Sequence, residues 1–142
     1  MTPEQKLLVQ STFGKVLHIS DTAADLFYTR LFELDPSLKV LFKGDLKEQG
    51  EKLMTMLGVI VNGLNRVSDL LPVVADLGRR HAKYGVKEKD YDTVGVALLW
   101  TLEKGLGDGF TPQTKEAWAM VYGMVASTMK QAAAELQVAH KA

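Results

Sequence analysis

The chain has 142 residues, enough for one domain with a substantial buried core. Its 17 basic and 17 acidic residues cancel, which argues against a nucleic-acid binder, and the absence of cysteine excludes disulfides and thiolate metal sites. Hydrophobic residues make up 46% of the chain, a fraction typical of a globular domain and too high for disorder. We therefore expect a single domain over residues 1–142.

The amino-terminal residues lack the apolar core of a secretory signal. The longest apolar run, Leu53 to Leu64, is interrupted by polar residues and glycines and is too short to cross a bilayer. These two features predict a cytoplasmic protein without a membrane partner.

Helical spacing of apolar residues dominates the chain, and no sustained two-residue alternation marks a strand. The first helix begins with a capping box at Thr2, followed by proline at its first position. Its apolar face comprises Val9, Phe13, Val16 and Leu17. A second helix begins at Ser20-Asp21 and ends before Asp35-Pro36, and a short helical turn follows as far as Phe42. The inward positions of this second helix are Ala24, Phe27, Tyr28, Leu31 and Leu34.

Four further helical stretches complete the pattern. A long helix is expected at about residues 46–64, and Ser68-Asp69 is expected to cap the next one, which ends at Tyr84-Gly85. Another helix covers about residues 89–106 and stops at a glycine-rich turn. Thr111-Pro112 caps the last helix. Six substantial helices and one short turn predict an all-α domain.

His81 is the histidine most relevant to function among the three in the chain. Together with Val74 and Leu77 it follows helical spacing, so its imidazole projects from an apolar face. No second histidine stands three or four residues away, which disfavours a zinc or di-iron site. On this pattern alone, such a histidine is more often a core residue than a ligand.

Two polar side chains stand among the apolar positions of other helices. Gln49 precedes Leu53 by one turn, and Tyr28 lies between Phe27 and Leu31. A buried amide or phenol needs a hydrogen-bond partner, which a nearby carbonyl or solvent can also supply. With His81 they describe a slot that has an imidazole on one wall and two polar donors opposite, the arrangement that a haem with a polar gas-binding side requires.

At these residues the chain resembles the globin family over nearly its full length. Phe42 matches the phenylalanine that stacks on the porphyrin, and His81 matches the proximal haem ligand. Three segments are similar to bacterial single-domain haemoglobins, the globin domains of flavohaemoglobins and neuroglobin: residues 53–58 (LMTMLG), 77–86 (LGRRHAKYGV) and 117–123 (AWAMVYG). The resemblance implies a globin fold, with six to seven helices packed three over three around haem b.

The resemblance also assigns the other side of the haem. Tyr28 and Gln49 take the two main distal positions, Leu53 lies beside the sixth coordination site, and no distal histidine is present. Two such donors imply that dioxygen is released slowly, by about two to four orders of magnitude. Nitric oxide and carbon monoxide are the other expected ligands.

Further cofactor contacts follow from the same resemblance. The imidazole N–H of His81 is expected to donate to a backbone carbonyl four residues back, at Leu77. Lys52 and Arg80 are expected at the haem propionates. The expected porphyrin contacts are Val86, Val94 and Val125, each of which is equally consistent with ordinary core packing.

Tyr91 matches a tyrosine that accompanies the proximal histidine in flavohaemoglobin-type globins. In those proteins a glutamate on the last helix completes a hydrogen-bonded network. Eleven residues after Tyr122, this chain has Ala133, and Glu135 lies about 200° further round the helix. We therefore expect the network to be incomplete.

Four functional hypotheses remain open. The first is a haem globin that binds, stores or delivers dioxygen, and the second is nitric oxide dioxygenation. The chain ends at Ala142 without a flavin or nicotinamide domain, so the second hypothesis requires a separate reductase. The third, gas sensing, requires an output module. The fourth is a haem-free interaction domain, against which the combination of Phe42 and His81 argues.

Overall fold

The computed structural model describes residues 1–42 and 44–141, with side chains as far as residue 136. Its elements are α1 (Pro3–Leu17), α2 (Ser20–Leu34), η1 (Pro36–Leu41), α3 (Leu46–Gly63), η2 (Leu64–Arg66), α4 (Val67–Lys83), α5 (Asp90–Leu106), η3 (Gly107–Gly109) and α6 (Pro112–Lys141), where η denotes a 3₁₀ helix. The described residues contain no strand, and the all-α class with six main helices is confirmed.

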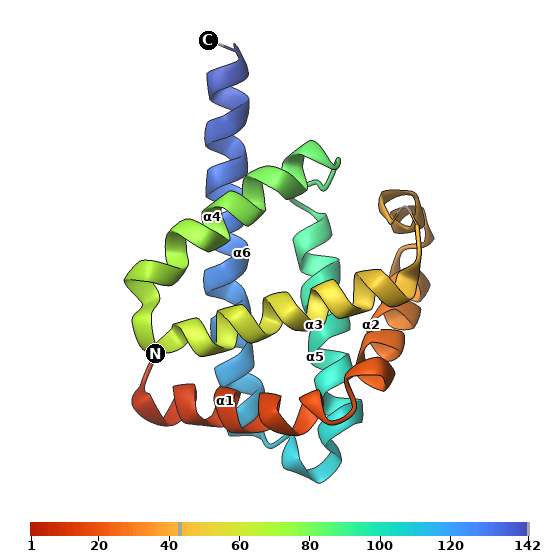
Figure 1. Cartoon of the computed structure of the whole chain (residues 1–142), viewed down its shortest axis with the longest axis vertical. Coiled ribbons are helices and arrows are strands. Elements are labelled where there is room, and N and C mark those ends of the chain that lie inside the picture. The colour runs from red at the N-terminus through yellow and green to blue at the C-terminus, as the bar shows by residue number, and fades with distance from the viewer. Residues whose placement is uncertain (43, 142) are drawn as a thin grey trace.

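The helices form two layers that cross one another (Figure 1). In this view α1, α3 and α4 pass in front of α5 and α6, and α2 packs against α3 and α5. The most extensive helix pairings are α4 with α6 and α2 with α5, followed by α2 with α3 and α1 with α6. In this view the end of α4 lies near the upper end of α5, and the start of α3 lies to the right of α5, beside α2.

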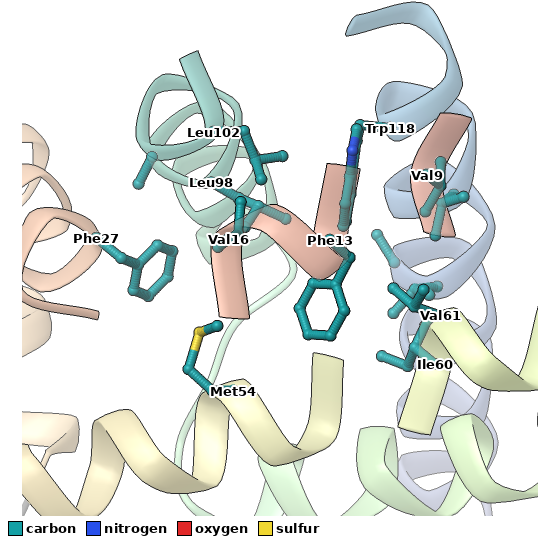
Figure 2. Close-up of a cluster of buried hydrophobic side chains, with 14 of the residues drawn as sticks. Val9, Phe13, Val16, Phe27, Met54, Ile60, Val61, Leu98, Leu102 and Trp118 are labelled. Carbon is teal, nitrogen blue, oxygen red and sulfur yellow. The ribbon is translucent and has the colours of Figure 1, made fainter. Parts of the chain in front are cut away.

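A buried core joins α1 to α6 and also includes side chains of α3 and α5 (Figure 2). Trp118 of α6 lies against Phe13 of α1, with 6.3 Å between ring centroids. The indole N–H of Trp118 donates to the hydroxyl of Thr12 at 2.9 Å, and that hydroxyl donates to the Leu8 carbonyl at 2.6 Å. The buried indole therefore has its hydrogen-bond partner, and α1 is held to α6 by both apolar and polar contacts.

Helix α4 is held directly against the backbone of α6. A Cβ built at Gly78 would lie 2.6 Å from both the Cα and the carbonyl oxygen of Met129. Real Cβ atoms do not approach a backbone this closely, so only glycine permits the crossing. The contact lies one turn before His81 and fixes the position of the helix that carries it.

Two of the expected helix caps are confirmed. The hydroxyl of Thr2 accepts from the Gln5 amide at 3.1 Å, and the Gln5 side chain accepts from the Thr2 amide at 2.9 Å. At the other end of the chain, the hydroxyl of Thr111 accepts from the Thr114 amide at 3.1 Å. These side chains satisfy amide groups that the helices leave without internal acceptors.

The cap expected at Ser68-Asp69 is wrong. Helix α4 begins at Val67, directly after η2, and has no side-chain cap. Arg66 leaves the helical conformation, with φ −141° and ψ 68°, and α4 starts again at Val67, so Ser68 already lies in the first turn of the helix. Asp69 pairs instead with Arg66 at 3.8 Å on the exposed surface.

Two leucines expected on inward faces are exposed. Leu17 is 48% exposed and Leu34 is 39% exposed. Each is the last residue of its helix, beyond the stretch that the neighbouring helices cover. The periodicity correctly places the middle of both helices, but it cannot show where the covering helix ends.

The segment Leu46–Lys83 contains an 18-residue window of mean hydropathy 1.2, long and apolar enough to cross a membrane by length and composition alone. The segment is two helices, α3 and α4, which meet at η2 and run in different directions (Figure 1). Core-facing helices pass the same test, and 28% of this window is buried. Several of its apolar side chains, such as Leu53 and Leu57, are half-buried on the side that faces the candidate site.

The Thr12–Trp118 hydrogen bond generates the first prediction. Thr12→Val removes the acceptor and leaves a buried indole N–H without a partner, so we expect the free energy of unfolding to fall by about 1–3 kcal/mol. Urea unfolding measures the change. Thr101→Val is the matched control, because Thr101 is equally buried but its hydroxyl donates only to Ala97 of its own helix. An equal loss in both variants contradicts the role given to the Thr12–Trp118 bond.

Candidate functional site

His81 lies in the last turn of α4 and is half-buried. Its Nδ1 atom is 2.8 Å from the carbonyl oxygen of Leu77, the acceptor expected from the sequence. A carbonyl can only accept, so the Nδ1 atom carries the proton and donates it to this bond. The Nε2 atom therefore keeps its lone pair, and the ring is fixed in the tautomer that can bind a metal.

The surroundings of His81 favour its neutral form. Burial lowers the pKa of the imidazole, and the charge of Arg80 lowers it further, while the hydrogen bond to the Leu77 carbonyl acts in the opposite direction. Only an unprotonated nitrogen can act as a metal ligand. Desolvation and the hydrogen bond thus prepare the same nitrogen for coordination.

An aromatic cluster lies at the junction of α2 and η1. The ring of Phe42, which directly follows η1, meets the ring of Tyr28 edge to face at 5.2 Å between centroids. Phe32 contacts both, at 5.5 Å from Phe42 and 6.1 Å from Tyr28. Such tilted contacts hold rings in defined orientations, and they place Phe42 beside the phenol of Tyr28.

Tyr28 presents a hydrogen-bond donor inside the molecule. The residue is 6% exposed, and burial raises the pKa of its phenol to about 12. The phenol therefore stays protonated at neutral pH. No hydrogen bond from this hydroxyl to another described residue is found, and its oxygen is not among the side-chain atoms that are closed off from solvent without a partner.

Helix α3 crosses α2 directly beside Tyr28. A Cβ at Gly50 would lie 2.8 Å from the Ala24 Cβ and 4.0 Å from the Tyr28 ring. The absence of a side chain at Gly50 lets the two helices approach. Gln49 and Leu53, one residue before and three residues after Gly50, are both half-buried. The assignment of Tyr28, Gln49 and Leu53 to the distal side of a haem stays a prediction.

The expected porphyrin contacts differ in burial. Val86 and Val94 are half-buried, as are Phe42, Leu53 and Leu77, and each packs against the edge of the core. Val125 is buried within the core itself, at 8% exposure. Two further half-buried residues that the sequence pattern does not single out are Leu41 and Leu57.

The two cations assigned to the propionates lie on the surface. Lys52 is exposed on α3. Arg80 is exposed on α4, where its Nε atom is 3.3 Å from the Asp76 carboxylate, one turn earlier in the same helix. Exposed pairs of this kind contribute little to stability, so Arg80 can exchange Asp76 for another anion at small cost.

The proximal surroundings contain tyrosines and a lysine. Tyr91 is buried, and its backbone carbonyl accepts a hydrogen bond from the Tyr122 hydroxyl at 2.5 Å. The Lys130 ammonium lies 5.8 Å from the Tyr91 ring centroid and 4.0 Å from the Asp92 carboxylate. Burial raises the pKa of the Tyr91 phenol, and the charge of the neighbouring Asp90 adds to the rise.

The sequence predicts that the last helix lacks the glutamate needed to complete a proximal network, and the structure shows the burial of the two residues concerned. Ala133 is half-buried on α6, and Glu135 is exposed. The aromatic ring found beside His81 is that of Tyr84, at 6.3 Å between centroids. Tyr84 follows His81 by three residues, so helical spacing was the signal that could have identified it.

Comparisons with known proteins identify the family. The globin family model matches residues 25–129. Neuroglobin of Danio rerio is 33% identical over 118 residues, which cover 73% of this chain and 74% of that protein. The chain therefore belongs to the globin family, as its resemblance predicts, and globins normally bind haem.

Flavohaemoproteins are also similar to this chain. That of Bordetella parapertussis is 28% identical over 132 residues, covering 91% of this chain, and that of Bacillus subtilis is 30% identical over 122 residues, covering 84%. This chain spans about a third of the length of those proteins. The family match contains Tyr28, Phe42, Gln49 and His81, whereas Ala133 lies beyond its end.

The residues present fit a haem. The imidazole of His81 offers a lone pair at Nε2, and the buried phenol of Tyr28 has no acceptor among the described residues. Apolar side chains of α3, α4 and α5, among them Leu53, Leu77 and Val94, are only half-buried against the core. A large flat apolar group bearing a metal would use the lone pair and cover these side chains.

The close crossing at Gly50 generates the second prediction. Gly50→Ala would place a Cβ against that of Ala24, which has no flexible end to move, so we expect a loss of about 1–3 kcal/mol in the free energy of unfolding. Gly58→Ala in the same helix is the control, since its Cβ would make an ordinary contact of 3.7 Å with Phe13. The control should be neutral or more stable by up to about 1 kcal/mol. Stabilisation of the Gly50 variant to the same extent contradicts the close crossing.

Proposed function

We propose that this globin binds haem b and uses it to bind dioxygen reversibly and release it slowly. The observation that carries the proposal is the pairing of a fixed, neutral His81 with a buried phenol at Tyr28 that has no acceptor in the described fold. When bound, the haem supplies an iron atom that takes up a diatomic gas.

On the proximal side, His81 acts as the anchor. Donation from Nδ1 to the Leu77 carbonyl increases the basicity of Nε2 and holds the ring at one angle. The Gly78 crossing keeps the backbone of this turn against α6, so the imidazole has little freedom to withdraw. Phe42 would stack on the ring system from its place beside Tyr28.

On the distal side, Tyr28 donates a hydrogen bond to the gas ligand. The bond would strengthen with the negative charge on that ligand, and the partly desolvated surroundings of the phenol would strengthen it further. One charge-assisted bond contributes about 1.5–3 kcal/mol, which slows release about 10- to 100-fold. Gln49 supplies a second donor, and Leu53 provides an apolar contact beside the ligand.

Nitric oxide dioxygenation is the second candidate function. The similarity to flavohaemoproteins over 91% of this chain favours it. Electrons would then come from a reductase. Sustained consumption of nitric oxide under air with a cellular reductase present supports this activity, and a single stoichiometric turnover supports dioxygen binding alone.

The third prediction concerns the anchor. His81→Gly should lose the intense Soret band of the haem-loaded protein, and added imidazole should restore it by entering the space of the missing ring. His18→Gly is the control, because His18 is an exposed residue that follows α1. An unchanged spectrum in the His81 variant excludes His81 as the ligand.

The fourth prediction concerns the phenol. Tyr28→Phe keeps the ring contacts and removes the donor, so we expect dioxygen release to accelerate about 10- to 100-fold, as stopped-flow spectroscopy would measure. Carbon monoxide release should change less, because the hydrogen bond depends on charge at the ligand. Tyr84→Phe at an exposed tyrosine is the control. An unaltered dioxygen release rate in the Tyr28 variant refutes the role of the phenol.

A further inference from the structure

The surface has a hollow of about 250 Å³ beside α5, near the start of α6. The hollow is lined by Val96, Leu99, Trp100, Glu103, Phe110 and Lys115. Its floor is apolar, because Leu99 and Phe110 pack against the edge of the core. Val96 is 53% exposed, an unusual degree for a valine in the middle of a helix. The hollow therefore offers apolar surface that the chain itself leaves uncovered.

Positive charge gathers around this apolar surface. The Arg30 guanidinium of α2 lies 5.3 Å from the Trp100 ring centroid, and the Lys104 ammonium lies 5.7 Å from the same centroid. Lys115 lines the hollow on the α6 side. Two cations thus flank the Trp100 ring and a third lines the hollow, whose lining includes one carboxylate, that of Glu103, in a chain whose net charge is zero.

These cations are not neutralised within the fold. Among the described residues, the ion pairs found involve other side chains, and none includes Arg30, Lys104 or Lys115. The Nε atom of Arg30 is buried without a hydrogen-bond partner. Two cations held near one indole ring repel each other, and a carboxylate from outside would relieve that repulsion.

We propose that this hollow is a docking site for an acidic partner protein. An apolar side chain of the partner enters between Val96, Trp100 and Phe110. Carboxylates beside it meet Arg30, Lys104 and Lys115. The apolar contact holds the partner in place, and the excess positive charge favours acidic partners over others, as is usual in transient interfaces. The site does not depend on haem binding.

A second copy of this chain fits the hollow less well. A symmetric contact would bring the same three cations from both copies to one interface. Among the residues that line the hollow each copy would offer one carboxylate, Glu103, in return, and like charges placed opposite each other oppose association. The charge balance therefore favours a partner of opposite sign.

The test uses the full haem-loaded chain and two blocked twelve-residue peptides. One peptide carries a leucine pair flanked by glutamates, and the other has lysines in place of the glutamates. We expect saturable binding of the acidic peptide, with amide shift changes centred on Val96, Trp100 and Lys115. Binding should weaken about tenfold or more between low and high salt. Equal binding of the lysine peptide, absence of binding, or shifts on another face overturns the proposal.

Charge reversal supplies the matched variants. Lys104→Glu combined with Lys115→Glu should weaken the acidic peptide about tenfold or more. Lys87→Glu combined with Lys89→Glu changes the net charge equally, at exposed positions in the connection between α4 and α5, and should leave binding within about twofold. If both pairs of substitutions weaken binding of the acidic peptide equally, the proposed docking site is wrong. If the wild-type chain associates with itself, and only the Lys104→Glu and Lys115→Glu pair changes this association, the hollow binds a second copy. That result would also overturn the proposal.

Discussion

Close approach at two glycines positions α3 and α4, two of the helices that carry residues of the candidate site. At Gly50, α3 meets α2 beside Tyr28, and at Gly78, α4 meets α6 one turn before His81. A methyl group at either place would meet atoms that cannot move aside, Ala24 in one case and the Met129 backbone in the other. The positions of the proposed donor, Tyr28, and the proposed anchor, His81, thus depend on helix crossings at two residues that have no side chain, Gly50 and Gly78.

Helix positions and the imidazole contact could be predicted because they depend on local pattern. Apolar spacing and turn residues place the six helices close to their observed bounds. The family resemblance predicts the contact of His81 with the Leu77 carbonyl, which lies four residues back in the same helix. Features that depend on a second helix could not be predicted. The Gly50 and Gly78 crossings, the exposure of Leu17 and the uncapped start of α4 at Val67 each depend on where another segment lies.

The candidate site differs from the core in how completely its apolar side chains are buried and its polar groups are hydrogen-bonded. Around Trp118, apolar packing is closed and the indole has its acceptor. Around His81, apolar side chains remain half-buried, and the phenol of Tyr28 has no acceptor among the described residues. Packing elsewhere in the fold stabilises a region that is incomplete by itself, and such regions are where proteins hold cofactors and ligands.

The aromatic cluster holds Tyr28 by its ring carbons. Phe27, Phe32 and Phe42 contact that ring, and none of these contacts involves its hydroxyl oxygen. The structural role and the chemical role of this residue thus belong to different atoms. Under the proposed function, ligand affinity and fold stability can therefore change independently during evolution, since gaining or losing one oxygen atom at this position leaves the ring packing intact.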